Sequence, residues 1–380
     1  MKETLKNIIC IMPIHIKNII ADMLSLFNLK KKKILKDLKN NFEYNDEKFK
    51  NINELEYKKN LANCINKMIC PVKDIKNFIT YLYLDKIEIT NEVELDYKNP
   101  TIICVVKNEY DKLLNFFEHY NKLGKINYIF IDNDSTDGTI ELLKENNAKI
   151  YSVKEKFLTI RKLAWINKIY STIPENSWTL LLDADELLVY YEYESKCLNE
   201  LTEAFEKNNI EIAGAVMLDM FSKHSCSRND YIKEYKFFQN SFEEKKSYWY
   251  NSIYGGIRER EFNFLKERIF LIKKHPLVKK KKENILISCH YIYPFEKNLK
   301  AATYLALLHY KLFDNEIQKY KKIAEDGSYG KGGGSKEYKL YLSKFAQKKY
   351  EDIFKTDENT LEFNGTETLK KISILKNNIN

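Results

Sequence analysis

The feature that most constrains the fold is a regular alternation of short apolar runs and amphipathic segments. Thr101 to Val106 (TIICVV) is apolar and rich in β-branched residues, and the segment DKLLNFFEHYNKLG after it has helical spacing and ends at Gly124. A second apolar run, Ile126 to Ile131, and a second helical segment, DGTIELLKEN, repeat the pattern. Strands that alternate with helices pair in parallel, because each helix carries the chain back to the start of the next strand. The sequence therefore predicts an α/β fold with a parallel sheet covered by helices on both faces.

The alternation continues with a third strand near Ala148 to Val153, a helix around Leu158 to Tyr170, and the strand WTLLL that begins at Trp178. In an open parallel sheet, ligands bind outside the carboxyl ends of the strands. Polar clusters fall at these ends: KNE after the first strand, DNDSTDGT after the second, and DADE after WTLLL. Because the three clusters are expected on one edge, we predict a binding site there.

The DADE segment places the carboxylates of Asp183, Asp185 and Glu186 directly after a buried-looking strand. On an extended backbone, residues two apart point to the same side with Cα atoms about 7 Å apart, so Asp183 and Asp185 would face one way. Uncompensated charge at the edge of a core is costly. A divalent cation such as Mg²⁺ or Mn²⁺ would offset the repulsion and keep positions open for substrate phosphates. Acidic pairs at strand ends also cap helices or face water. The prediction of a metal site therefore rests less on the pair of aspartates itself than on its position after a strand of the β-α array.

Composition limits the partners and the compartment. The 380 residues carry 63 Lys and Arg against 54 Asp and Glu, a formal net charge of +9, with basic runs at Lys30 to Lys33 and Lys279 to Lys282. These runs indicate anionic partners, but without a basic recognition helix we expect no nucleic acid among them. The seven cysteines are an odd number without zinc spacing, and Cys104 and Cys289 fall in strand-like runs. This usage is typical of a reducing, cytoplasmic compartment.

Three regions differ in pattern: residues 1–97 form a predicted helical extension, 98–300 the α/β domain, and 301–380 a helical segment packed on it. After Pro13, apolar residues recur at helical spacing up to Phe27, and the first lysine run follows. Such a helix either lies on an anionic membrane surface, which would place the protein at the inner face of the membrane, or packs on the main domain. No window reaches the length of an uncharged membrane span.

The blocks VVKNEYDKLLNFFEHYNKLG, IFIDNDSTDGTIELL and WTLLLDADELLVY, in this order, resemble the nucleotide-sugar-binding half of family 2-like glycosyltransferases, in the branch with a V-[KR]-N-E opening and a D-A-D-E segment. LDMF, YGGIRER, HPLVK, SCHYIYP, ALLHYKLF and GSKEYKLY are similar to later blocks of that branch, so the likeness spans roughly Thr101 to Tyr341. Lys107 stands where arginine is common, and Asn133 replaces the second acid of the usual turn.

This resemblance implies the GT-A fold, a Rossmann-like nucleotide-diphospho-sugar transferase fold with a mostly parallel central sheet. It also implies transfer of a sugar, with inversion, from a nucleotide-diphosphate donor to a hydroxyl of a glycan or lipid-linked acceptor, in surface glycan or polysaccharide synthesis. The chemistry requires a metal to neutralise the departing diphosphate, a base for the acceptor proton, and an anomeric carbon held in line.

The resemblance and the strand ends together assign roles to particular residues. We predict Mn²⁺ or Mg²⁺ ligands at Asp183, Asp185 and His290, with His309, expected on an apolar helix face, as the rival imidazole. The base is Asp219 or Glu259, with Glu186 as a third option. Arg258 and Arg260 beside two glycines are predicted to hold the diphosphate, because guanidinium groups match phosphate oxygens. The remaining predicted nucleotide contacts are Lys107, Asn108, Glu109, Asp132, Asn133 and Arg161.

Two other functions fit parts of the pattern. A sugar nucleotidyltransferase shares much of the fold, although the domain has no early loop rich in glycine with a lysine. A catalytically inactive membrane-surface scaffold would keep the fold without turnover. A phosphatase-like hydrolase is disfavoured, because its paired acids follow the opening strand, whereas Asp183 follows several β-α units.

Overall fold

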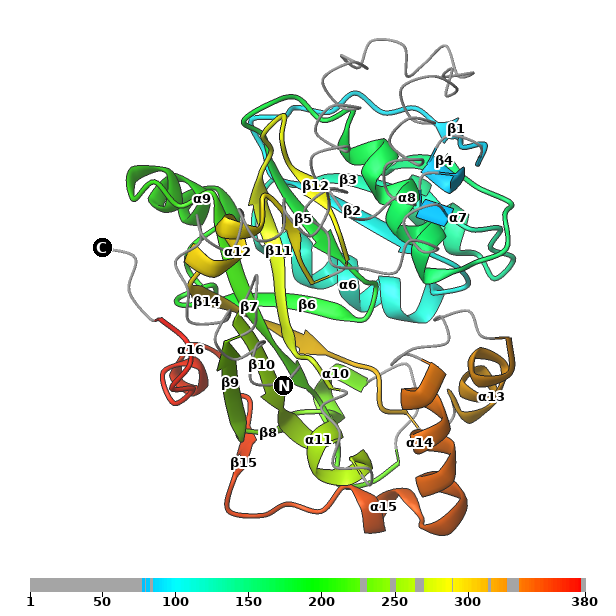
Figure 1. The fold of residues 1–380 in the computed structure, drawn as a ribbon, viewed down its shortest axis with the longest axis vertical. Helices are drawn as coiled ribbons and strands as arrows, with labels where there is room; N and C mark the ends of the chain where they lie inside the picture. Colours follow the sequence, from blue (N-terminus) through cyan, green and yellow to red (C-terminus); the bar gives the residue numbers. More distant parts are fainter. Residues whose placement is uncertain are drawn as a thin grey trace, which may run out of the picture.

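The computed structural model describes residues 77–78, 80–82, 85–225, 231–246, 251–263, 270–288, 290–313, 316–326 and 335–376. The predicted N-terminal helix after Pro13, the first lysine run and Cys289 lie outside the described residues. Figure 1 shows a twisted central sheet that passes through both the upper and the lower part of the molecule, with helices packed against it.

The central sheet has nine strands in the order β1-β4-β3-β2-β5-β11-β7-β14-β6. Their bounds are β1 Glu88–Asn91, β2 Thr101–Val106, β3 Asn127–Asp132, β4 Lys149–Ser152, β5 Trp178–Leu182, β6 Glu186–Tyr190, β7 Ile212–Asp219, β11 Lys273–Lys279 and β14 Thr303–His309.

The first half of this sheet confirms the predicted β-α alternation. Strand β2 pairs in parallel with β3 and β5, and β3 pairs in parallel with β4. Helices α6 (Tyr110–Lys122) and α7 (Thr139–Glu145) pack with Ile102 on one face of the sheet, whereas α8 (Thr159–Tyr170) packs with Ile103 on the other. Neighbouring strand residues face opposite sides because the side-chain period of a strand is two. The four strands form the Rossmann-like part of the fold (Figure 1).

The second half of the sheet is mixed. Strand β11 is antiparallel to both β5 and β7, β14 is parallel to β7, and β6 is antiparallel to β14. Strand β1 is antiparallel to β4 at the other edge. The result is a mixed α/β protein with a large central sheet in which most strands run in one direction.

Two regions predicted to be helical each contribute a strand to the central sheet. Strand β14 falls in the region 301–380 predicted to be helical, and β1 falls in the predicted helical extension 1–97. His309 therefore ends a strand and is not on a helix. The run TYLALLH is apolar throughout, so its period does not separate a strand from a buried helix. The run forms a strand because it pairs with β7 on one side and β6 on the other. A strand at this position is covered on both faces, which explains why its residues are apolar throughout.

Smaller elements surround the sheet. The described helices of the C-terminal region begin only after β14. The smaller elements around the sheet are α9 Leu198–Lys207, α10 Tyr231–Glu234, β8 Phe237–Gln239, β9 Phe242–Lys246, β10 Asn251–Gly255, α11 Gly256–Phe262, β12 Ile285–Leu286, β13 Ile292–Tyr293, α12 Phe295–Lys300, α13 Ile317–Asp326, α14 Ser335–Gln347, α15 Tyr350–Ile353, β15 Thr360–Glu362 and α16 Thr366–Leu369.

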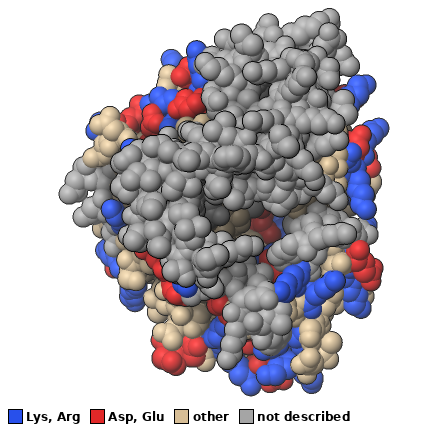
Figure 2. Space-filling view, in the orientation of Figure 1, with Lys and Arg blue, Asp and Glu red and all other residues tan. Residues whose placement is uncertain are grey.

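The described surface mixes both signs of charge. Figure 2 shows Lys and Arg side chains beside Asp and Glu side chains over the described part of one face of the molecule. Within the described residues, every helix is too short or too polar to cross a membrane.

Candidate active site at the carboxyl edge of the sheet

Strand register brings the predicted acidic clusters to one edge. Val106 at the end of β2 lies opposite Asp132 at the end of β3, and β2 also aligns with the end of β5, just before Asp183. In the second half of the sheet, His309 at the end of β14 lies opposite both Asp219 of β7 and Glu186 of β6. Acidic and imidazole groups from five strands thus meet along the carboxyl edge, where open α/β sheets bind ligands.

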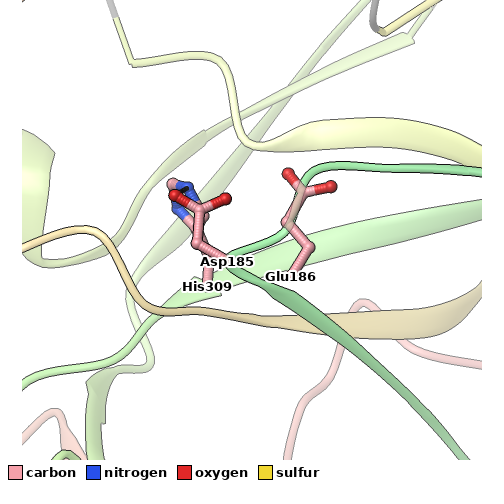
Figure 3. Close-up of side chains that lie close together, drawn as sticks. All are labelled: Asp185, Glu186 and His309. Carbon is pink, nitrogen blue, oxygen red and sulfur yellow. Dashed lines mark ion pairs between the residues drawn. The ribbon is translucent and has the colours of Figure 1, made fainter. Parts of the chain in front are cut away.

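Three potential metal ligands cluster at this edge. Asp185, Glu186 and His309 each offer one ligand atom, and these atoms lie within 4.8 Å of one another. Figure 3 shows the Asp185 carboxylate beside the His309 ring, with the Glu186 carboxylate next to them on the same side of the chain. The group combines the oxygen and nitrogen donors that divalent cations accept in proteins.

The backbone of the DADE segment differs from the predicted extended form. The Glu186 N–H donates to the Asp183 carbonyl at 3.1 Å, so the segment is a turn between β5 and β6. The extended geometry predicted for Asp183 and Asp185 is therefore wrong. Asp185 faces His309, whereas Asp183 contacts the lysines described below and is not part of the three-ligand cluster. A chain that reverses direction within four residues cannot keep the period-two alternation of a strand.

Lysines from three elements neutralise the acidic edge. Asp183 binds Lys162 of α8 through one oxygen, and its other oxygen lies 3.4 Å from Lys274 of β11. Lys274 also binds Glu186, whose second oxygen accepts the Asp183 N–H at 3.1 Å. Asp185 lies 3.7 Å from Lys112 of α6. Helices α6 and α8 and strand β11 thus each contribute a positive charge to the edge.

These contacts determine the protonation of the two aspartates. Burial disfavours the charged form of Asp183, but Lys162 and Lys274 outweigh this effect and hold the pKa of its carboxyl far below the usual range. For Asp185, burial acts in the same direction, but Lys112, His309 and Lys311 together outweigh it, so the pKa is lowered. Both carboxylates are therefore ionised at neutral pH, as metal ligands must be.

The three lysines were not among the residues predicted from the sequence. Lys112 lies on the apolar face of α6, one turn before Phe116. A lysine on the apolar face of a helix is the sequence signal that indicates a buried ionic partner. Lys162 follows Arg161, which was predicted instead. Successive helical residues point about 100° apart, so only one of this pair can face the sheet edge.

Asp132 and Asn133 present unused acceptors at the end of β3. One Asp132 oxygen accepts the N–H groups of Asp134 and Ser135 at 3.1 and 3.2 Å. The Asn133 amide donates to the carbonyls of Val153 and Glu155, each at 2.9 Å. The remaining side-chain oxygens of Asp132 and Asn133 are buried and have no hydrogen-bond partner in the described part of the chain. Buried acceptors of this kind are rare, and a ligand N–H or O–H would satisfy them.

The residues of the KNE segment mainly form hydrogen bonds and ion pairs, and two of them hold the loop that follows β3 in place. The Lys107 ammonium donates to the Asn133 carbonyl at 2.8 Å. Asn108 donates its N–H to Ser135 Oγ at 2.9 Å and accepts the Thr136 N–H at 2.7 Å. Glu109 pairs with Lys319 of α13 at 2.7 Å and with Lys112 at 3.4 Å. Lys107 and Asn108 thus hold the loop that carries Asp132 and Asn133.

The structure does not bring Arg161 and Arg260 into the cluster. Arg161 pairs with Glu155 at 3.0 Å and with Asp85 at 3.3 Å. Arg260 binds Asp357 at 3.0 Å and the Lys355 carbonyl at 2.6 Å, near the C-terminal end of the described chain. Both guanidinium groups therefore fasten peripheral segments in this structure.

Asp219 and Glu259, the two predicted bases, have different surroundings. Asp219 binds His309 Nδ1 at 2.6 Å through one oxygen and Arg258 Nε at 2.7 Å through the other. Burial acts to raise the pKa of its carboxyl, but Arg258 and His309 together outweigh burial and lower it. Glu259 accepts from Asn263 and has a buried oxygen without a partner among the described residues. Burial raises the pKa of Glu259, as a general base requires.

His290 lies outside the three-ligand cluster. Its Nδ1 contacts the Lys273 carbonyl at 2.8 Å, and its own carbonyl contacts His275 Nδ1 at 2.7 Å. The imidazole beside Asp185 is that of His309, with Nε2 at 3.9 Å from the carboxylate. The sequence could not choose between them, because the choice depends on which strand reaches the edge.

These features define a mixed α/β protein with a group of acidic and imidazole side chains at the carboxyl edge of its sheet that could hold a metal ion. No protein-family model matches the chain, and a search of curated proteins finds no matching relative. Among solved structures, the crystal structure of S. aureus TarS is similar to this chain at 13% sequence identity and a TM-score of 0.25. The match covers 34% of this chain and 23% of that chain, which is too little to bear on function.

Proposed function

We propose that the protein is a glycosyltransferase of the GT-A fold that moves a sugar from a nucleotide-diphosphate donor to an acceptor hydroxyl. The observation that carries the proposal is that Asp185 and His309 lie close together on the same edge of the sheet as the unused oxygen of Asp132. The candidate metal ligands and the oxygens that could accept hydrogen bonds from a nucleotide lie at the carboxyl ends of the strands. Open α/β sheets bind their ligands at these ends. The resemblance in sequence between Thr101 and Tyr341 agrees with this reaction.

The side chains fit a divalent cation. Asp185 and His309 are the best ligands, because Glu186 already binds Lys274 and the Asp183 N–H. Bound Mn²⁺ or Mg²⁺ would supply positive charge for the departing diphosphate. Lys162 and Lys274 add fixed positive charge at the same edge and are better placed for the diphosphate than Arg260.

The remaining roles in the reaction are assigned to residues at the end of β3 and in α11. Asp132 and Asn133 would accept hydrogen bonds from the base or the ribose, while Lys107 and Asn108 keep their loop in place. Glu259 is the remaining candidate for the base, since both oxygens of Asp219 are engaged. A glycan or lipid-linked acceptor, and a cytoplasmic location at an anionic membrane surface, stay predictions from the sequence.

The decisive variant is Asp185→Asn. We expect it to lower metal-dependent release of nucleoside diphosphate from a nucleotide sugar by about 100-fold or more, because loss of a ligand should exceed the 10- to 100-fold cost of losing an outer-shell partner. The fold should remain, since the carboxylate lies at the sheet edge and not in the core. A coupled assay over a panel of nucleotide sugars with Mn²⁺ measures the effect.

The matched control is Asp352→Asn, which makes the same change at an exposed residue of α15 paired with Lys355. It should retain full turnover. If Asp185→Asn turned over donors as fast as Asp352→Asn did, the metal site would be refuted.

A specific observation favours a second candidate, a nucleotide-sugar-binding scaffold without turnover. Lys112, Lys162 and Lys274 already neutralise the acidic edge, so the carboxylates are compensated without a metal. Thermal shift separates the two, because a ligand stabilises the native state by mass action. A scaffold would be stabilised equally by a donor with and without Mn²⁺ and would release no nucleoside diphosphate, whereas the transferase would show stronger stabilisation with Mn²⁺.

A further inference from the structure

A buried chain of ionic contacts runs from the candidate site into the C-terminal helices. His309 Nδ1 lies 2.6 Å from Asp219 Oδ1, Asp219 Oδ2 accepts from Arg258 Nε at 2.7 Å, and Arg258 Nη1 donates to Glu337 of α14 at 3.0 Å. The Asp219 side chain is 0% exposed and that of Arg258 4%. Glu337 is held in turn by Lys311 at 2.7 Å and by the Tyr341 hydroxyl.

The contact to Asp219 restricts the proton of His309. A neutral imidazole carries one N–H, and its other nitrogen has a lone pair. An ionised carboxylate has no hydrogen to donate, and the Arg258 guanidinium at Oδ2 favours this ionised form, so Asp219 Oδ1 can only accept. Nδ1 must therefore carry the hydrogen, which leaves the Nε2 lone pair on the side of Asp185, 3.9 Å away.

The arrangement follows from strand register. Asp219 ends β7 and His309 ends β14, and the two residues lie opposite each other in this parallel pair. Side chains of paired residues point to the same face of a sheet. The pairing of β7 with β14 therefore brings the Asp219 carboxylate and the His309 ring together, and no loop is needed to position them. Carboxylates that accept the second N–H of a histidine orient that histidine for a metal.

We propose that Asp219 is a positioning residue that holds His309 in the Nδ1–H tautomer, with Nε2 as the ligand atom, and that Arg258 and Glu337 keep Asp219 in place. The role in metal binding rests on the proposed function, whereas the tautomer does not. A purely structural ion-pair chain would affect stability but would leave the tautomer and the metal affinity unchanged.

The tautomer can be observed directly in metal-free protein labelled with ¹⁵N-histidine, at a pH where the ring is neutral. The chain has six histidines, and the signal of His309 is the one lost in His309→Gln. We expect the Nδ1–H tautomer in the wild type. In Asp219→Leu/Arg258→Met, which removes both buried charges together, we expect a shift to the Nε2–H tautomer and a 10- to 100-fold loss of Mn²⁺ affinity in calorimetry with the metal alone.

Arg258→Lys is the matched control, because it changes the same arginine but keeps a positive charge beside Asp219 and the acceptor for Nδ1. It should retain the Nδ1–H tautomer. An Nε2–H tautomer in the wild type, or an unchanged tautomer or Mn²⁺ affinity in the folded double variant, would overturn the proposal. If the double variant did not fold, the wild-type tautomer would still decide. A lack of donor turnover would count against the proposed function and leave this result intact.

Discussion

Single residues decide which imidazole serves the site. The sequence places His290 and His309 in similar apolar surroundings, and only the structure sets His309 beside Asp185 and Asp219. His290 instead contacts the Lys273 carbonyl through Nδ1 at 2.8 Å. The same geometry is the reason for proposing Asp219 as a support for His309 and no longer as the base.

A pair of substitutions tests this difference. His309→Gln should lower the affinity for Mn²⁺ at least about 10-fold, because a ligand atom is lost, while His290→Gln should leave it within about twofold. Calorimetric titration of the metal-free protein with MnCl₂ measures both. Equal losses in the two variants, or a loss in His290→Gln alone, would return the ligand role to His290.

At the scale of elements, the junction between β10 and α11 sets the position of Arg258. Gly255 has φ of 132°, a conformation that L side chains rarely adopt, and a Cβ there would overlap the Ser241 carbonyl oxygen. That oxygen also accepts the Gly256 N–H at 3.0 Å. The glycine thus permits close contact between Ser241, which precedes β9, and the start of α11, and this contact holds the helix against Asp219.

Gly255→Ala should therefore destabilise the protein by about 2 kcal/mol or more, through backbone strain and steric overlap. Urea denaturation followed by circular dichroism measures the change. Glu141→Ala, at an exposed position of α7, is the control and should stay within about 0.5 kcal/mol of the wild type. A Gly255→Ala protein as stable as this control would show that the junction carries no strain.

The stability of the whole molecule should depend on pH through two histidines away from the cluster. Burial lowers the pKa of His119 and of His275 to about 4, although each ring contacts a backbone carbonyl. In the unfolded chain both return to about 6.5. Between pH 6.5 and 4 the unfolded state therefore binds more protons, and stability falls as the pH is lowered.

Each histidine should contribute a slope of about 1.4 kcal/mol per pH unit within that window and nothing above it. Urea denaturation at pH 7.5, 6.0 and 5.0 measures the effect, and His275→Gln should remove about half of the slope. An equal pH dependence in the wild type and in His275→Gln would mean that His275 titrates normally in the folded state.

The sequence by itself determined the β-α alternation from Thr101 onwards and the location of acidic clusters at strand ends, because periods of 2 and 3.6 are properties of local segments. Only the tertiary structure decided that residues 303–309 form a strand of the sheet and that DADE is a turn. It also decided which lysines and which histidine reach the edge. Those outcomes depend on register between strands far apart in the chain and on burial by covering helices, and neither is encoded in the spacing of nearby residues.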